Sequence, residues 1–254
     1  MEVLNVKNIQ EIYQAENGEI SALKNISFTA QKGELISIVG PSGCGKSTLL
    51  SILAGLLKPT GGEVYVKGEK VNGVSPHIGY MMQKDSLLDW RNIYKNVMFG
   101  LEVRGMMQPE YRERAEKLLK TYGLYEFKDK YPSQLSGGMR QRVALIRTLA
   151  INPDILLLDE AFSALDYQTR LTVTDDVYRI LKQEQVTTIM VTHDIPESIS
   201  MGDKVLIFSQ RPAEIKEVLE IDFEDPDRTP ISCRNNPKFS RYFDHIWREL
   251  SANE

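Results

Sequence analysis

The stretch "ELISIVGPSGCGKST", residues 34–48, joins a short unbroken apolar run to a glycine-rich loop. The loop fits the phosphate-binding pattern G-x-x-x-x-G-K-[ST], and it stands between a strand-like run and a helical run, as that pattern requires. In such a loop, backbone N–H groups and the N-terminus of the following helix converge on phosphate oxygens. The stretch therefore predicts a site for a nucleoside triphosphate at the end of a strand.

The side chains of this loop have distinct expected roles. We expect Lys46 to reach the outer phosphates and the Ser47 hydroxyl to ligate Mg²⁺. A glycine-rich turn without a ligand is the structural alternative, and the Lys-Ser pair argues against it. The chain contains no N-K-x-D guanine-reading sequence, which disfavours a GTPase. The expected nucleotide-binding residues of the loop are Gly40, Pro41, Ser42, Gly43, Cys44, Gly45, Lys46, Ser47 and Thr48.

Short apolar runs bounded by turns recur along the chain, and helical patterns at 46–57, 168–184 and 196–201 separate several of them. Unbroken apolar runs are typical of strands that are covered on both faces. Strands that alternate with helices predict an α/β fold of the P-loop NTPase type. We expect a mostly parallel sheet flanked by helices, with an antiparallel β part near the N-terminus. The runs are "ELISIVG", "GEVYVKG", "HIGYMM", "DILLLD", "TTIMVT" and "KVLIFS".

Residues 89–150 lack strand signals and contain three successive helical patterns. We therefore expect one ATPase domain at 1–222, with a helical subdomain inserted at about 89–150. Residues 223–254 form a Pro-rich C-terminal extension that ends in a helix. An aromatic and aliphatic stripe at helical spacing predicts that this helix docks on the core. The stripe consists of Phe239, Phe243, Ile246, Trp247 and Leu250.

The bulk composition is that of an ordinary globular chain: 254 residues, 42% hydrophobic and 26% charged. The net charge of −4 gives no support to a nucleic-acid-binding face. Cys44 and Cys233 are too few and too far apart for a disulfide framework or a metal knuckle, which favours a reducing cytosol. The sequence shows no signal peptide and no apolar run near the roughly 18 residues of a membrane helix.

Two later strand-like runs end in groups that can handle metal and water. In "ILLLDE", Asp159 at the strand end is expected to hold Mg²⁺, and Glu160 to polarise the attacking water. In "IMVTHD", His193 follows the next apolar run and is expected on the same rim of the sheet. An ordinary acidic strand end and a structural histidine are the corresponding alternatives.

A second anion cradle follows far downstream, in "LSGGMRQR" at 135–142. Ser136 can cap a helix that begins near Gly138, and the two glycines let a phosphate approach the backbone closely. A single Ser would suffice for a helix cap, and one nucleotide does not need two cradles in one chain.

This stretch resembles the signature sequence of the ATP-binding cassette (ABC) family, and the resemblance extends over essentially the whole chain. It implies a head-to-tail homodimer in which Ser136, Gly137 and Gly138 close over the ATP held by the other subunit. It also implies ATP and Mg²⁺ as cofactors. The "SALD" segment at 163–166 then crosses the dimer interface.

The same resemblance assigns roles to single residues. Tyr13 matches an aromatic ring that stacks on adenine, although an exposed strand aromatic is the alternative. Gln83 of "YMMQKD" matches a glutamine that contacts Mg²⁺ and the attacking water, and that hinges toward a transmembrane partner. Asp159 and Glu160 match the metal-binding and catalytic acids, and His193 matches the histidine at the γ-phosphate.

Two positions depart from the common family pattern. Ala161 stands where a proline often follows the catalytic glutamate, and Met82 stands where an aromatic residue is common before the glutamine. Neither change removes a reacting group, so we expect activity to survive both.

Three features look like the nitrate/sulfonate/taurine-type importer ATPases, a subgroup that also contains riboflavin and thiamine-precursor importers. They are Met139, the stretch "LLDWRNIYKNVMFGLEVRG" at 87–105, and the ending "SQRPAEIKEVLEIDF" at 209–223. Asp89 departs from the subgroup, which usually has proline before the Trp-Arg pair. Trp90 itself is either a core residue at the start of a helix or part of a coupling surface.

The resemblance implies the ATP-hydrolysing motor subunit of an importer, bound peripherally to the cytoplasmic face of the membrane. Its partners are a transmembrane permease subunit and, indirectly, a solute-binding protein, with no nucleic acid. A non-transport cassette in DNA maintenance, translation or cluster assembly is the alternative. The chain lacks the long coiled-coil insertion and the second cassette of such proteins.

Overall fold

A six-stranded sheet in the order β10-β9-β3-β8-β7-β6 forms the larger of two sheets. The computed structural model describes residues 1–15 and 18–251, so the middle of "QAENGEI" and the last three residues of the expected extension lie outside it. All neighbouring strands are parallel except β10, which runs antiparallel to β9. Its strands are β3 (Leu35–Val39), β6 (Ile78–Met81), β7 (Ile155–Asp159), β8 (Thr187–Val191), β9 (Lys204–Phe208) and β10 (Ile215–Glu220).

A second, antiparallel sheet forms the N-terminal part, in the order β2-β1-β4-β5. It confirms the expected antiparallel part, and it includes "GEVYVKG", whose sheet membership the sequence could not assign. A buried apolar cluster fills the space between the two sheets and α1 (Lys46–Leu53). The strands are β1 (Glu2–Ala15), β2 (Gly18–Gln31), β4 (Gly61–Val66) and β5 (Glu69–Lys70).

Helix α1 ends at Leu53, one turn before the Leu57 that the apolar pattern predicts. The reason is Gly55, which has a φ of +73°, in the left-handed region that ends helices. A Cβ atom at this position would lie 1.8 Å from the carbonyl oxygen of Gly73, so the turn also depends on the missing side chain.

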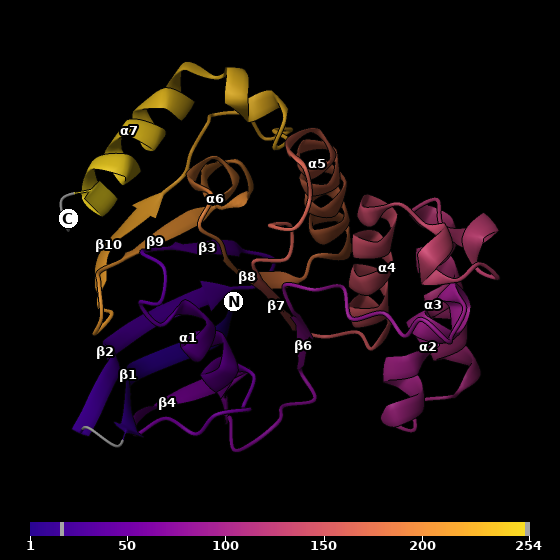
Figure 1. The fold of residues 1–254 in the computed structure, drawn as a ribbon, viewed down its shortest axis with the longest axis horizontal. Coiled ribbons are helices and arrows are strands. Elements are labelled where there is room, and N and C mark those ends of the chain that lie inside the picture. The colour runs from indigo at the N-terminus through magenta and orange to yellow at the C-terminus, as the bar shows by residue number, and fades with distance from the viewer. Residues whose placement is uncertain (16–17, 252–254) are drawn as a thin grey trace.

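Three further helices gather at one side of the molecule, beyond β6 and β7 (Figure 1). They share a cluster with fully buried Leu101, Leu119 and Leu145, as expected for helices that pack on one another. These helices are α2 (Ile93–Val103), α3 (Pro109–Thr121) and α4 (Gly137–Ala150), with short 3₁₀ turns at Tyr125–Phe127 and Pro132–Gln134. All three fall within the stretch that lacks strand signals.

The C-terminal part covers the opposite end of the larger sheet. After α5 (Tyr167–Glu184) and α6 (Ile195–Met201), a 3₁₀ turn at Ser232–Asn235 leads into α7 (Pro237–Ser251), which lies over α6 and β9 (Figure 1). Within the expected stripe, Ile246 is fully buried and three others are partly buried against the same cluster. Trp247 departs from the prediction: it is 57% exposed, at the edge of the stripe, and stacks on Phe243 at 6.1 Å.

None of the described helices combines the length and the apolar character that crossing a membrane requires.

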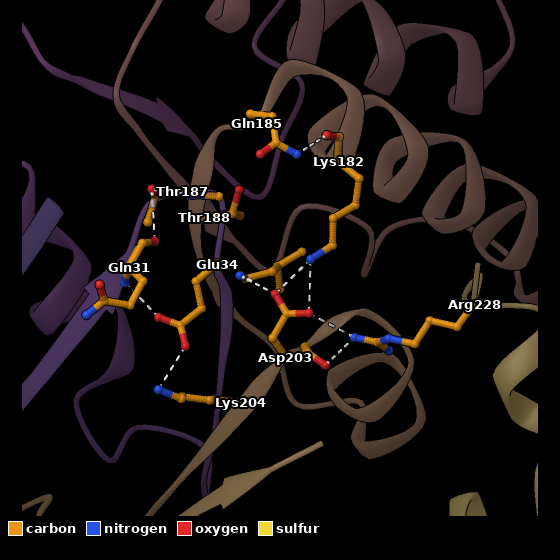
Figure 2. A network of polar contacts seen from close by, with 12 residues as sticks. Gln31, Glu34, Lys182, Gln185, Thr187, Thr188, Asp203, Lys204 and Arg228 are labelled. Atoms are coloured by element: carbon orange, nitrogen blue, oxygen red, sulfur yellow. Dashed lines mark hydrogen bonds and ion pairs between the residues drawn. The ribbon is translucent and has the colours of Figure 1, made fainter. Parts of the chain in front are cut away.

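Asp203, just before β9, joins three distant parts of the chain (Figure 2). Its carboxylate accepts hydrogen bonds from the backbone N–H of Leu35 at 2.8 Å and from Lys182 Nζ at 2.8 and 2.9 Å. It also accepts one from Arg228 at 3.2 Å. The Arg228 side chain is buried, and it also donates to two carbonyls at the end of α6. The C-terminal part is thus fastened to the beginnings of β3 and β9 and to the end of α5.

Replacing Asp203→Ala should lower the free energy of unfolding by about 2–4 kcal/mol. Removing one partner of an ion pair leaves the other charge uncompensated, here the buried Arg228 guanidinium. Urea unfolding monitored by circular dichroism measures the change, provided that the slope against denaturant stays constant.

Glu214→Ala is the matched control, because it removes the exposed ion pair with Lys24. Exposed pairs contribute up to about 1 kcal/mol, so the control should stay within that range. Equal losses in the two variants would contradict a structural role for the Asp203 network.

Candidate nucleotide-binding site

The glycine-rich loop follows β3 and curls around the side chain of Lys46. Lys46 is only 6% exposed, and its ammonium donates to the carbonyl oxygens of Gly40 at 2.7 Å and Pro41 at 2.9 Å. Gly43 and Gly45 have φ angles of +73° and +127°, a region that glycine adopts without steric cost. The loop therefore has the backbone curvature that phosphate binding requires, with its cation at the centre.

Ser47 and Asp159, the two predicted metal ligands, lie next to each other. Ser47 Oγ donates to Asp159 Oδ1 at 3.0 Å, although the residues are 112 positions apart. A hydroxyl and a carboxylate are hard oxygen donors, and Mg²⁺ is usually bound by one or two such groups together with substrate phosphates. Among the described residues, no cluster of three or more His, Cys, Asp or Glu side chains offers an all-protein cage. The pair fits Mg²⁺ bound alongside a nucleotide.

Glu160, His193 and Gln83 meet at the ends of three neighbouring strands. Glu160 Oε2 lies 3.2 Å from His193 Nδ1 and 3.5 Å from Gln83 Nε2. Gln83 Nε2 also donates to Ser163 Oγ at 3.2 Å, in the "SALD" segment. The structure therefore brings together the three residues that the sequence assigns to the attacking water and the γ-phosphate.

The backbone of Glu160 turns its carboxylate away from that of Asp159. Its φ of +46° lies in the left-handed region, where a non-glycine residue costs about 1–3 kcal/mol. Hydrogen bonds hold it there: Glu160 N donates to Val191 O at 2.9 Å, and Ser163 donates to Glu160 O at 2.9 and 3.1 Å. Two adjacent acids thus face different partners, as separate metal and water roles require.

Tyr13 lies beside the beginning of α1. Its ring is 40% exposed, and its hydroxyl is 3.2 Å from Thr48 Oγ1. An exposed ring next to the phosphate loop can stack on a base. This placement agrees with the role in adenine binding that the resemblance implies. It agrees equally with the alternative, in which Tyr13 is an exposed aromatic residue on a strand.

The second cradle opens α4, in the helical group, and Figure 1 shows this helix apart from α1, which begins at Lys46. Ser136 caps α4, because its hydroxyl accepts from Met139 N at 3.3 Å. Packing within the same chain also explains the glycine at position 138, because a Cβ atom there would lie 2.7 Å from Val173 Cγ2 on α5. Exposed Ser136 and the backbone of Gly137 are the parts of the cradle that face outward.

Two arginines on α4 hold the loop that follows Gln83. Arg147 donates to the carbonyl oxygens of Asp85 and Ser86, both at 2.7 Å, and Arg140 pairs with the Asp85 carboxylate at 3.0 Å. Trp90, further along, is 75% exposed, so its interpretation as a core residue is wrong. It precedes α2 on the surface, because the buried positions of that helix begin at Ile93.

Further residues support the site without a clear signal in the sequence. Arg170 donates to the Leu165 carbonyl at 2.9 Å and pairs with Asp194 at 3.0 Å, so it links "SALD" to the residue after His193. Arg211, in the turn between β9 and β10, donates to the Gly43 carbonyl. For Arg170, the sequence offered one signal, namely its position one helical turn after "SALD". For Arg211, the sequence spacing offered no signal.

A family model described as ABC transporter matches residues 23–163. The chain belongs to the ABC transporter family. As an ABC transporter ATP-binding protein, it is an ATPase of the translocase type, and its nucleotide is ATP.

Curated relatives cover nearly the whole chain. An ABC transporter ATP-binding protein of Bacillus subtilis, YtlC, is 45% identical over 100% of this chain and 98% of its own length. The nitrate import ATP-binding protein NrtD of Synechocystis is 37% identical over 99% and 96%. The taurine import ATP-binding protein TauB of Ruegeria pomeroyi is 40% identical over 89% and 84%.

A solved structure has the same fold. It is a dimeric ATP-binding cassette in a post-hydrolysis state, bound to ADP and Pi. The two chains superpose with a TM-score of 0.72 at 34% identity, over 86% of this ABC ATPase and 99% of that chain.

Lys46→Ala should weaken ATP binding by about 10–100-fold, because a hydrogen bond to a charged group contributes roughly 1.5–3 kcal/mol. Isothermal titration calorimetry in the presence of Mg²⁺ measures the dissociation constant. Lys58→Ala, which removes an exposed cation beyond α1, is the control and should leave the constant unchanged. Equal affinities for all three proteins would exclude Lys46 from phosphate binding.

Proposed function

We propose that this chain is the ATP-hydrolysing motor subunit of an importer, peripheral on the cytoplasmic face of a membrane. A separate permease and, indirectly, a solute-binding protein are its partners. The meeting of Glu160, His193 and Gln83 beside the Ser47–Asp159 pair carries the proposal, because it joins water activation to phosphate and metal binding. Relatives named for nitrate and taurine import support a nitrate/sulfonate/taurine-like anion as the solute. A vitamin-precursor-type molecule is the alternative that the subgroup resemblance leaves open.

The chemical step divides among the residues at this edge of the sheet. Lys46 binds the outer phosphates of ATP, and Glu160 accepts a proton from the attacking water while Gln83 orients that water. His193, 3.2 Å from Glu160, orients the carboxylate and contacts the γ-phosphate. Ser47, Asp159 and Gln83 would hold Mg²⁺, which neutralises charge on the phosphate oxygens when it is bound.

We also propose that two copies of this chain assemble head to tail, with ATP between the loop of one and Ser136 of the other. Support comes from the separation of α4, which Ser136 caps, from α1 of the same chain, which begins at Lys46 (Figure 1). The related cassette of known structure is described as dimeric. We assign the ATPase domain to residues 1–222, the inserted helical subdomain to about 89–150, and the C-terminal extension to 223–254.

A groove beside the Gln83 loop is the proposed docking site for the permease. It has a volume of about 380 Å³ and lies between the end of α1, β6, α2 and α4. Leu56, Val74 and Met82 line it with exposed apolar side chains, which is typical of a surface that another protein covers. Arg147 lines the same groove and holds the loop, so docking and the site share a structural element.

Glu160→Gln should reduce ATP turnover by about 10²–10⁴-fold and leave ATP binding in place, because the amide keeps the shape and cannot accept the proton. Phosphate release gives the rate, and calorimetry gives the affinity. Glu69→Gln, on the distant antiparallel sheet, is the control for the charge change. Turnover of E160Q within about threefold of wild type would exclude Glu160 as the general base.

Ser136→Asp should abolish hydrolysis without weakening ATP binding to the dilute monomer, because the new carboxylate repels the ATP held by the partner. Asp and Asn both cap helices well, so Ser136→Asn is a matched control that preserves α4 and adds no charge. It should retain more hydrolysis than S136D.

Mixing S136D with Lys46→Ala chains tests the head-to-tail arrangement further. In the mixed dimer one site combines both lesions, and the other combines an intact loop with an intact signature. Hydrolysis should therefore reappear on mixing, at a level below that of wild type. Loss of ATP binding by monomeric S136D would show that Ser136 acts on the nucleotide of its own chain.

A further inference from the structure

The hydroxyl of Tyr80 contacts the oxygen of Asp159 that Ser47 does not. Ser47 Oγ donates to Oδ1 at 3.0 Å, and the Tyr80 hydroxyl donates to Oδ2 at 3.0 Å. The two donors belong to different elements: Ser47 is on α1, and Tyr80 is on β6. The carboxylate is thus held at both oxygens, and each oxygen has a different neighbour.

The Tyr80 ring is itself fixed by the strand and by packing. Tyr80 pairs with Leu157 of β7, two residues before Asp159, and its ring packs against the apolar cluster between α1 and the sheets. The hydroxyl therefore has a fixed position from which it donates to Asp159.

A carboxylate needs such a constraint when only one of its oxygens is to face a metal. The terminal torsion of aspartate is broad, so an unsupported Asp159 could present either oxygen. A donor fixed on Oδ2 leaves Oδ1 toward Ser47. Outer partners that orient a metal ligand in this way typically affect metal affinity by about 10–100-fold.

We propose that Tyr80 is a positioning residue for the Mg²⁺ site: its hydroxyl holds Asp159 so that Oδ1 and Ser47 Oγ face the metal together. This inference rests on the proposed function, which assigns Mg²⁺ to Ser47 and Asp159. Packing accounts for the ring but not for the hydroxyl, since phenylalanine would fill the same space.

The test is Tyr80→Phe, which removes only the hydroxyl. Calorimetry gives the affinity for a non-hydrolysable ATP analogue in Mg²⁺ and in EDTA, and the ratio of the two is the Mg²⁺ enhancement. We expect the enhancement to fall by about 10-fold, at the lower end of the range for outer partners. The affinity in EDTA and the urea midpoint should not change. Mn²⁺ binding to the analogue complex, measured by electron paramagnetic resonance, should weaken in parallel.

Tyr65→Phe is the matched control, because the Tyr65 hydroxyl also donates to a carboxylate, that of Glu63 at 2.6 Å on β4. It should keep the full enhancement. Asp159→Asn provides the reference for a damaged metal site.

The outcomes separate the two proposals. If wild type shows no Mg²⁺ enhancement, or D159N keeps it, the assigned metal site is wrong. If both behave as expected and Y80F keeps the wild-type enhancement, the Tyr80 inference alone is wrong. Equal weakening of Y80F in Mg²⁺ and EDTA, or a lower urea midpoint that accounts for the loss, would show a structural role and overturn the inference.

Discussion

Parallel pairing of β3, β8, β7 and β6 places the carboxyl ends of four strands at one edge of the sheet, and the site depends on that edge. The register pairs Met81 with Leu158 and Asp159 with Val191, so the loops after these strands begin at nearly the same level. Residues far apart in the chain, such as Gln83 and His193, thereby reach the same carboxylate. A slip of one residue in any strand would turn its side chains to the other face and take the site apart.

Opposite requirements apply at the two edges of this sheet. At the carboxyl edge, Glu160 is held in a left-handed backbone conformation that the surrounding hydrogen bonds must support. At the amino edge, Asp203 satisfies a backbone N–H group and two cations at once (Figure 2). Strain at the reactive edge is compatible with a stable fold because the hydrogen bonds and ion pairs of Asp203 fasten the other edge.

Contiguous motifs made much of this site predictable. Ser47 lies within the phosphate-binding pattern, and Asp159 ends an apolar strand pattern, so both could be assigned to metal binding. The alternation of runs with helical patterns predicted the α/β layers. Tyr80 was not predictable, because a tyrosine inside a strand pattern acquires its partner only through the pairing of β6 with β7. The exposure of Trp90 was equally hidden, since an aromatic residue before a helix occurs in cores and on surfaces alike. In the proposed importer, other chains recognise the solute, so no residue here encodes it.

The contacts of Arg140 and Arg147 with the loop after Gln83 have a thermodynamic consequence. They make the loop and α4 one body, so a displacement of the loop is also a displacement of Ser136, which caps that helix one turn before Arg140. Linkage is reciprocal: a protein that favours one position of this body changes the affinity for nucleotide by the same factor by which nucleotide changes the affinity for that protein. In the proposed head-to-tail dimer, the two arginines thus link binding at the loop to the ATP that faces Ser136 from the neighbouring subunit.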